Sequence, residues 1–150
     1  MPHQRPFAVL LGLLSLAWAV SSTAIAGESR EAGPPVFVVV TAEDNQTRGM
    51  ALVLARQMLD QGATLRVLLC GPGGELAIAG AQEAALAPRG ITPQQLLRGL
   101  IADGVQVDVC ALFLPNSPHG EDQLLEGIGV AMPPEVARYM LGDGVRYFTF

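Results

Sequence analysis

The sequence contains no lysine, few aromatic residues and little positive charge. All nine basic residues are arginines, set against 14 acidic residues over 150 positions, and the arginines form no cluster. This balance argues against nucleic acid or an anionic membrane as a partner, because phosphate groups are bound by clustered positive charge. Half of the residues are apolar but only 5% are aromatic, so we expect a core of aliphatic side chains.

The motifs of several common enzyme classes are also missing. The segment 71–74 (GPGG) has neither the lysine and spacing of a P-loop nor the pattern GxGxxG, so a tight turn is the better interpretation. There is no GxSxG elbow for a serine nucleophile. The cysteines, His119 and the acidic residues match no tight metal-ligand spacing. We therefore expect no metal and no other cofactor.

The one long hydrophobic run lies near the N-terminus. Arg5 precedes an almost uninterrupted apolar stretch at 7–20, and residues 24–26 (AIA) are small where signal peptidase cleaves. The run is short for a bilayer core of about 30 Å, although a retained N-terminal anchor is the alternative. We predict a cleavable signal peptide at 1–26 and a periplasmic or secreted protein, with no membrane contact after cleavage.

The remainder is predicted to form one α/β domain. Residues 27–35 (GESREAGPP) are typical of a flexible linker, and 36–150 are enough for a single hydrophobic core. Runs of strand length alternate with helical patterns, which favours a mostly parallel sheet with helices on both faces. We expect strands at 36–40, 65–70, 105–112, 128–132 and 145–150, helices at 48–61, 92–102 and 133–141, one or two short helices within 75–87, and a helical turn at the start of 124–132.

Capping residues predict where two of the helices begin. Asn45 or Thr47 can cap the helix at 48–61. The segment 92–95 (TPQQ) gives a clearer signal, with Thr92 as N-cap, proline at the first helical position and Gln95 at the capping-box position.

Two predicted strands carry polar side chains on one face. Alternation along 65–70 and 105–112 places Arg66 and Asp108 on the same side as both cysteines, if these strands are parallel neighbours. Arg66 then offsets the cost of burying Asp108. Cys70 and Cys110 would lie near each other at the carboxyl ends of their strands, where α/β sheets gather functional groups.

Cys110 is the strongest candidate for a reactive group. It ends a strand and precedes a loop that contains His119, and a nearby histidine can raise the fraction of reactive thiolate. The acidic residues around it oppose thiolate formation. The alternatives are a small buried side chain or half of a disulfide with Cys70, which is the common state of a cysteine pair in an oxidising compartment.

The order of these segments resembles the DsrE/DsrF-like sulfur-relay family. The resemblance rests on the glycine-rich end of the second strand, on 104–111 (GVQVDVCA), on 127–130 (GIGV) and on the closing strand after 143–145 (DGV). It implies a three-layer α/β/α sandwich with a five-stranded, mainly parallel sheet in the order 4-3-2-1-5, and a homo-oligomer. It also implies that the cysteine matching Cys110 carries a persulfide, accepted from one protein and passed to another.

Three functional hypotheses follow. The first is an exported sulfur carrier that uses Cys110, with His119 or a backbone N–H group helping to hold the thiolate. The second is a non-catalytic oligomeric binding module with a structural Cys70–Cys110 disulfide. The third is a thiol–disulfide protein in redox sensing, in which the pair acts as a switch. We expect His119 to lie in a mobile loop and to contribute little alone.

Overall fold

The computed structural model describes Met1 and residues 33–150. Five strands form one sheet in the order β4-β3-β2-β1-β5, and all four pairings are parallel. The predicted fold class and strand order are confirmed. The predicted signal peptide and most of the predicted linker lie outside the described residues.

The strands are β1 (Pro35–Val40), β2 (Thr64–Leu69), β3 (Gln106–Cys110), β4 (Ile128–Ala131) and β5 (Arg146–Thr149). The helices are α1 (Asn45–Asp60), α2 (Pro93–Ala102) and α3 (Pro133–Met140). Three short 3-10 elements complete the described fold: η1 (Gly71–Ala77), η2 (Leu114–Asn116) and η3 (Glu121–Gln123).

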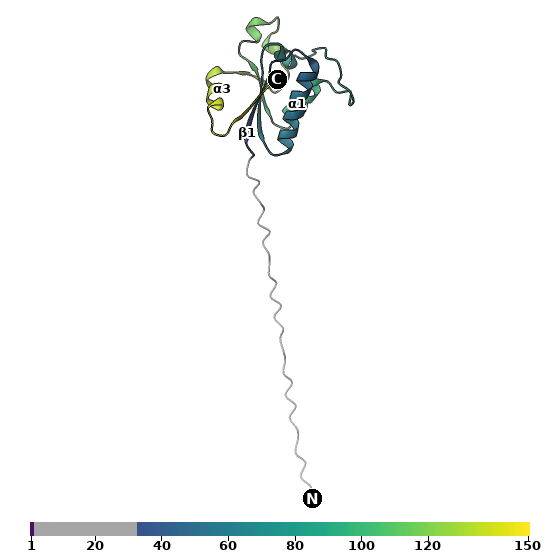
Figure 1. Cartoon of the computed structure of the whole chain (residues 1–150), viewed down its shortest axis with the longest axis vertical. Coiled ribbons are helices and arrows are strands. Elements are labelled where there is room, and N and C mark those ends of the chain that lie inside the picture. The colour runs from purple at the N-terminus through teal and green to yellow at the C-terminus, as the bar shows by residue number, and fades with distance from the viewer. Residues whose placement is uncertain (2–32) are drawn as a thin grey trace.

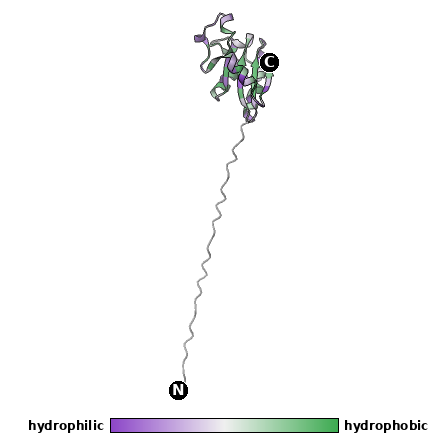
Figure 2. Cartoon of the chain, turned by 90° about the vertical axis from the view of Figure 1, so that its left-hand side faces the viewer, coloured by the Kyte–Doolittle hydropathy of each residue, from purple (hydrophilic) through white to green (hydrophobic). Residues whose placement is uncertain are grey.

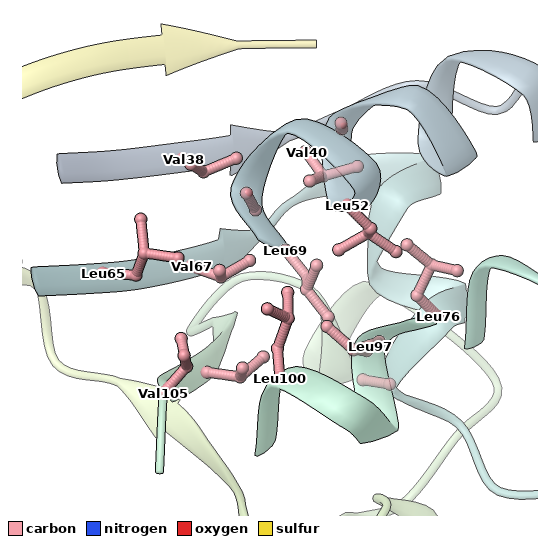
Figure 3. Packing of buried hydrophobic residues seen from close by; sticks show 14 of the residues in the cluster. Val38, Val40, Leu52, Leu65, Val67, Leu69, Leu76, Leu97, Leu100 and Val105 are labelled. Carbon is pink, nitrogen blue, oxygen red and sulfur yellow. The ribbon is translucent and has the colours of Figure 1, made fainter. Parts of the chain in front are cut away.

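The sheet lies between α1 and α3, as Figure 1 shows. On the face that α1 and α2 cover, alternate residues of β1, β2 and β3 are buried against both helices (Figure 3). Valine, leucine and alanine make up most of this core, as the low aromatic content predicted. Burying a side chain of this kind stabilises the fold by about 1.5–3 kcal/mol relative to leaving it exposed. No helix within residues 33–150 is both long enough and apolar enough to cross a membrane.

The opposite face holds the predicted polar side chains. Arg66 and Asp108 are only 8% and 7% exposed, and the Arg66 Nη2 atom donates to the Asp108 Oδ2 atom over 2.9 Å. Gln106 donates to the same oxygen, and the Arg66 guanidinium lies 5.5 Å from the centre of the Tyr139 ring of α3. The predicted shared face is confirmed, and the buried charges are paired as their desolvation requires. Figure 2, viewed from the α3 side, shows hydrophobic residues along the strands of this sheet.

Two helix starts test the capping predictions. Thr92 accepts from the Gln95 N–H, and the Gln95 side chain accepts from the Thr92 N–H, so the predicted capping box is confirmed. Helix α1 begins earlier than expected, because Asp44 rather than Asn45 or Thr47 is its N-cap. The Asp44 carboxylate accepts from the Thr47 N–H over 2.7 Å, a bond that lowers the pKa of Asp44.

The alanine-rich segment after β2 was predicted to form one or two short helices within 75–87. Apart from the end of η1, it forms no helix. Beyond η1, residues 78–92 follow an irregular path that is held by two isolated bridges, Ile78 with Leu124 and Leu86 with Ile91. The Gln94 side chain donates to two backbone carbonyls of this region, and Gly80 has a positive φ of 80°. These long-range bonds outweigh the helix propensity of alanine. The helical turn expected at the start of 124–132 is also displaced, to η3.

Candidate thiol site

Both cysteines lie at the carboxyl ends of neighbouring strands. Cys110 is the last residue of β3, and Cys70 follows β2 with extended backbone angles of φ −127° and ψ 155°. The parallel register pairs Leu69 with Val109, so its next step places Cys70 beside Cys110. Both are half-buried free thiols in the structure. The two thiols therefore form one site at the rim of the sheet.

The surroundings of Cys70 hold its thiol in the protonated form. Burial, a hydrogen bond with Cys110 and the charge of the Cys110 thiolate raise the pKa of Cys70 to about 12. At neutral pH Cys70 therefore remains a protonated thiol. The thiolate is the nucleophilic form of cysteine, so Cys70 is a poor nucleophile at this pH.

A pocket of about 510 Å³ opens beside Cys110. Pro72 and Glu75 of η1 line it, together with Leu112 and Phe113 from the loop after β3. Cys110 belongs to the lining of this pocket and Cys70 does not. A molecule that enters the pocket therefore contacts Cys110 and not Cys70.

Close backbone packing builds the wall of this pocket. A Cβ atom on Gly73 would lie 2.1 Å from the Val40 carbonyl oxygen, and one on Gly74 would lie 2.4 Å from the Phe113 ring. Only glycine allows η1 to approach β1 and Phe113 this closely. Residues 71–74, which the sequence predicted as a tight turn, are the first four residues of the 3-10 element η1.

The His119 side chain contacts Glu75 and Phe113. Its Nε2 atom lies 3.1 Å from the Glu75 Oε2 atom, and its ring stacks on Phe113 with a centroid distance of 6.3 Å. Among the described residues no hydrogen bond joins this ring to Cys70 or Cys110. The ring therefore contacts two groups that line the pocket, and the mobility of its loop stays a prediction.

Three residues around the site were missed from the sequence. Glu75 and Phe113 line the pocket, and their only sequence signal is that each closely follows a strand end. Arg48 is buried, donates to the carbonyl oxygens of Ala42 and Pro72, and holds two loops at this rim. Its position on the buried face of α1, one turn before Leu52, was a signal that could have found it.

Within the part of the chain that the structure describes, no three His, Cys, Asp or Glu side chains gather closely enough to hold a metal ion.

The fold is a DsrE-like α/β/α sandwich, with two thiols at the carboxyl rim of its sheet. It is similar to the YchN protein from E. coli, with 22% identity, a TM-score of 0.60, and coverage of 78% of this chain and 98% of that chain. It is also similar to MTH1491, a protein of unknown function from Methanobacterium thermoautotrophicum, with 18% identity, a TM-score of 0.60, and coverage of 77% and 97%. Identity this low shows the fold alone. No protein-family profile and no curated protein matches the sequence.

Proposed function

We propose that this chain is an exported sulfur-handling protein that accepts a sulfane sulfur atom on Cys110 as a persulfide. The observation that carries the proposal is the position of Cys110, a half-buried thiol that ends β3 and lines a pocket of about 510 Å³. A rigid strand end holds the sulfur in place, while the pocket leaves room for a donor. The DsrE-like fold supports the sulfur-relay class.

The transfer is a displacement at sulfur. The Cys110 thiolate attacks the outer sulfur of a donor persulfide, and the donor S–S bond breaks with its electron pair on the inner donor sulfur. That sulfur takes a proton and leaves as a thiol, and Cys110 becomes a persulfide. The sulfane sulfur keeps its oxidation state, so the step needs no oxidant or reductant.

The pocket lining favours certain donors. Glu75 places a carboxylate there, and Leu112 and Phe113 add apolar surface. No arginine is among the described residues that line the pocket, and the nearby Arg48 guanidinium is bound to Ala42 and Pro72. Small anionic donors such as thiosulfate are therefore disfavoured, because the lining offers them a carboxylate and no arginine. A persulfide carried by a donor protein or a low-molecular-weight thiol suits the pocket.

The place of action and the partners are part of the same proposal. Export rests on the signal-like segment at 1–26. The partners are a sulfur donor or acceptor protein and further copies of this chain. Nucleic acid is disfavoured by the net charge of −5 and by the scattered arginines.

A second function, an oligomeric binding module with a structural disulfide, is favoured by one observation. Neighbouring strands lie about 4.7–4.9 Å apart, within the Cα separation of about 4.4–6.8 Å that a disulfide spans. The register that places Cys70 beside Cys110 therefore permits this bond.

Single-cysteine variants test the proposed function. Reduced Cys70→Ser and Cys110→Ser proteins are treated with glutathione persulfide, and their intact masses are measured. We expect one added sulfur atom on Cys70→Ser, which keeps Cys110, and none on Cys110→Ser. Absence of added sulfur on both variants would contradict the proposal. A wild-type pair that is fully oxidised after purification and resists reduction while folded would favour the structural disulfide.

A further inference from the structure

We infer that Cys70 is the second reacting thiol of the site: it attacks the persulfide formed on Cys110 and expels the outer sulfur as hydrogen sulfide, leaving a Cys70–Cys110 disulfide. The inference rests on the proposed function and adds the fate of the sulfur. The protein would then reduce sulfane sulfur instead of only storing it for an acceptor.

The placement of the two thiols carries this inference. Cys70 keeps the extended backbone of β2, and its N–H donates to the Val40 carbonyl oxygen over 3.0 Å, so it is fixed at the sheet rim. The register brings it beside Cys110. A thiol held next to a reacting sulfur has a far higher effective concentration than a thiol in solution. Cys70 is therefore the nearest nucleophile for a persulfide on Cys110.

The two thiols differ in whether they can be reached from the pocket. Cys110 lines the pocket and Cys70 does not, so a donor in the pocket reaches Cys110 while Cys70 stays behind it. The outer sulfur of a persulfide on Cys110 can extend into the pocket. Its inner sulfur then remains next to Cys70, and the expelled hydrosulfide has open space through which to leave.

The step balances in atoms and electrons. The Cys70 sulfur bonds to the Cys110 Sγ atom, and the bond from that atom to the outer sulfur breaks. The electron pair goes to the outer sulfur, which leaves as hydrosulfide and takes up the proton that Cys70 loses. The outer sulfur gains two electrons and the cysteine pair loses two as its disulfide forms.

The protonation of Cys70 agrees with this order of events. Burial and the interaction with Cys110 raise the pKa of Cys70 to about 12, so Cys70 remains a thiol while the Cys110 thiolate reacts with the donor. Cys70 thus carries the proton that the leaving hydrosulfide needs.

A second reaction must restore the pair. The disulfide has to be reduced by a dithiol protein or a small dithiol through thiol–disulfide exchange. The class of reaction that follows this one is therefore dithiol oxidation. Without such a reductant the protein should complete one turnover and stop.

A single-turnover experiment tests the inference. Wild type, Cys70→Ser and Cys110→Ser are reduced, freed of reductant and mixed with one equivalent of glutathione persulfide. Released sulfide, intact mass and remaining free thiols are then measured. We expect the wild type to release close to one equivalent of sulfide and to lose both thiols to a disulfide. Cys70→Ser should keep one added sulfur atom, and its sulfide release should fall to the background set by Cys110→Ser.

The outcomes separate this inference from the proposed function. If wild type and Cys70→Ser both keep the added sulfur, the inference is overturned and the proposed function stands. If neither Cys70→Ser nor the wild type reacts, both are overturned. A glutathione adduct on Cys70→Ser in place of a single sulfur atom would also overturn both, because the donor would then have been attacked at its inner sulfur. Cys70→Ala serves as a second variant, with circular dichroism to show that each protein is folded.

Discussion

At the scale of single residues, the site depends on a difference between two cysteines of similar burial. Cys70 and Cys110 are both half-buried and belong to adjacent strands. The pKa of Cys70 is raised to about 12, which keeps its proton in place across the physiological range. Because Cys110 and not Cys70 lines the pocket, we assign the first nucleophilic attack to Cys110.

Limited alkylation measures that difference directly. The reduced wild type, treated with a small amount of iodoacetamide at neutral pH, should be modified first at Cys110. Since the sequence has no lysine, trypsin cleaves only after arginine, and the cysteines fall on separate peptides, 67–89 and 99–138. Modification of Cys70 should rise about tenfold per pH unit as the pH approaches 12, because the thiolate fraction rises in that proportion.

The Cys110→Ser variant is the matched control for this measurement. It removes the negative charge that a thiolate at position 110 exerts and leaves the burial of Cys70, so the pKa of Cys70 should fall and its alkylation at a given pH should be faster. Equal labelling of the two wild-type cysteines at neutral pH would contradict the assigned asymmetry.

At the scale of elements, η1 shapes the pocket through its glycines. A Cβ on Gly74 would lie 2.4 Å from the Phe113 ring, so Gly74→Ala must displace that ring. We expect a loss of about 1–3 kcal/mol in the free energy of unfolding, as for other overpacked cores. Urea denaturation measures this loss, and sulfur uptake by Cys110 should fall in the same variant because the pocket wall moves.

Gly99→Ala makes the same chemical change where there is space. A Cβ on Gly99, in α2, has nothing within 4 Å, and alanine favours helices over glycine by about 0.5–1 kcal/mol. This control should therefore be neutral or stabilising. A Gly74→Ala protein as stable as Gly99→Ala would contradict the packing described for η1.

The contact between β2 and β3 depends on the Arg66–Asp108 pair. Removing one member leaves an uncompensated buried charge, so Asp108→Ala should lower the free energy of unfolding by about 3–5 kcal/mol. The double variant Arg66→Met/Asp108→Leu should recover most of that loss, since it leaves no buried charge. Chemical denaturation of both proteins gives the answer, and a double variant no more stable than the single one would contradict this account.

Local patterns were sufficient to predict most of the elements. Alternation along β2 and β3 placed Arg66 and Asp108 on one face, and the signal at 92–95 placed the start of α2. The features that the sequence did not predict depend on long-range contacts. Bonds from Gln94 draw the segment after η1 out of a helix, and Glu75 binds His119 from 44 residues away. Nothing in the local sequence encodes such pairings, so the pocket beside Cys110 was not predicted.

At the scale of the whole molecule, three large apolar or aromatic side chains are exposed near the end of α3. Leu141 is 86% exposed, and the neighbouring Met140 and Tyr147 are also exposed, with Tyr147 donating to the Met140 carbonyl oxygen. Exposed apolar surface of this kind marks association sites. Together with the resemblance to the sulfur-relay family, this surface supports the proposed homo-oligomer.

Light scattering after size exclusion tests the proposed assembly. The wild type should elute with the mass of a multimer, and Leu141→Glu should shift it toward the monomer, because a buried unpaired carboxylate is costly. The domain should remain folded, since Leu141 is outside its core. A wild type that is monomeric at micromolar concentration would contradict the assembly.

The central claim is that the Cys110 sulfur of the exported, folded protein is free to accept sulfur. The most direct measurement uses Cys70→Ser protein recovered from the exported fraction, treated with glutathione persulfide, alkylated and digested with trypsin. The account predicts one added sulfur atom on the alkylated peptide 99–138, located at Cys110. A peptide that carries only the alkylated thiol, with no added sulfur after treatment, would contradict it.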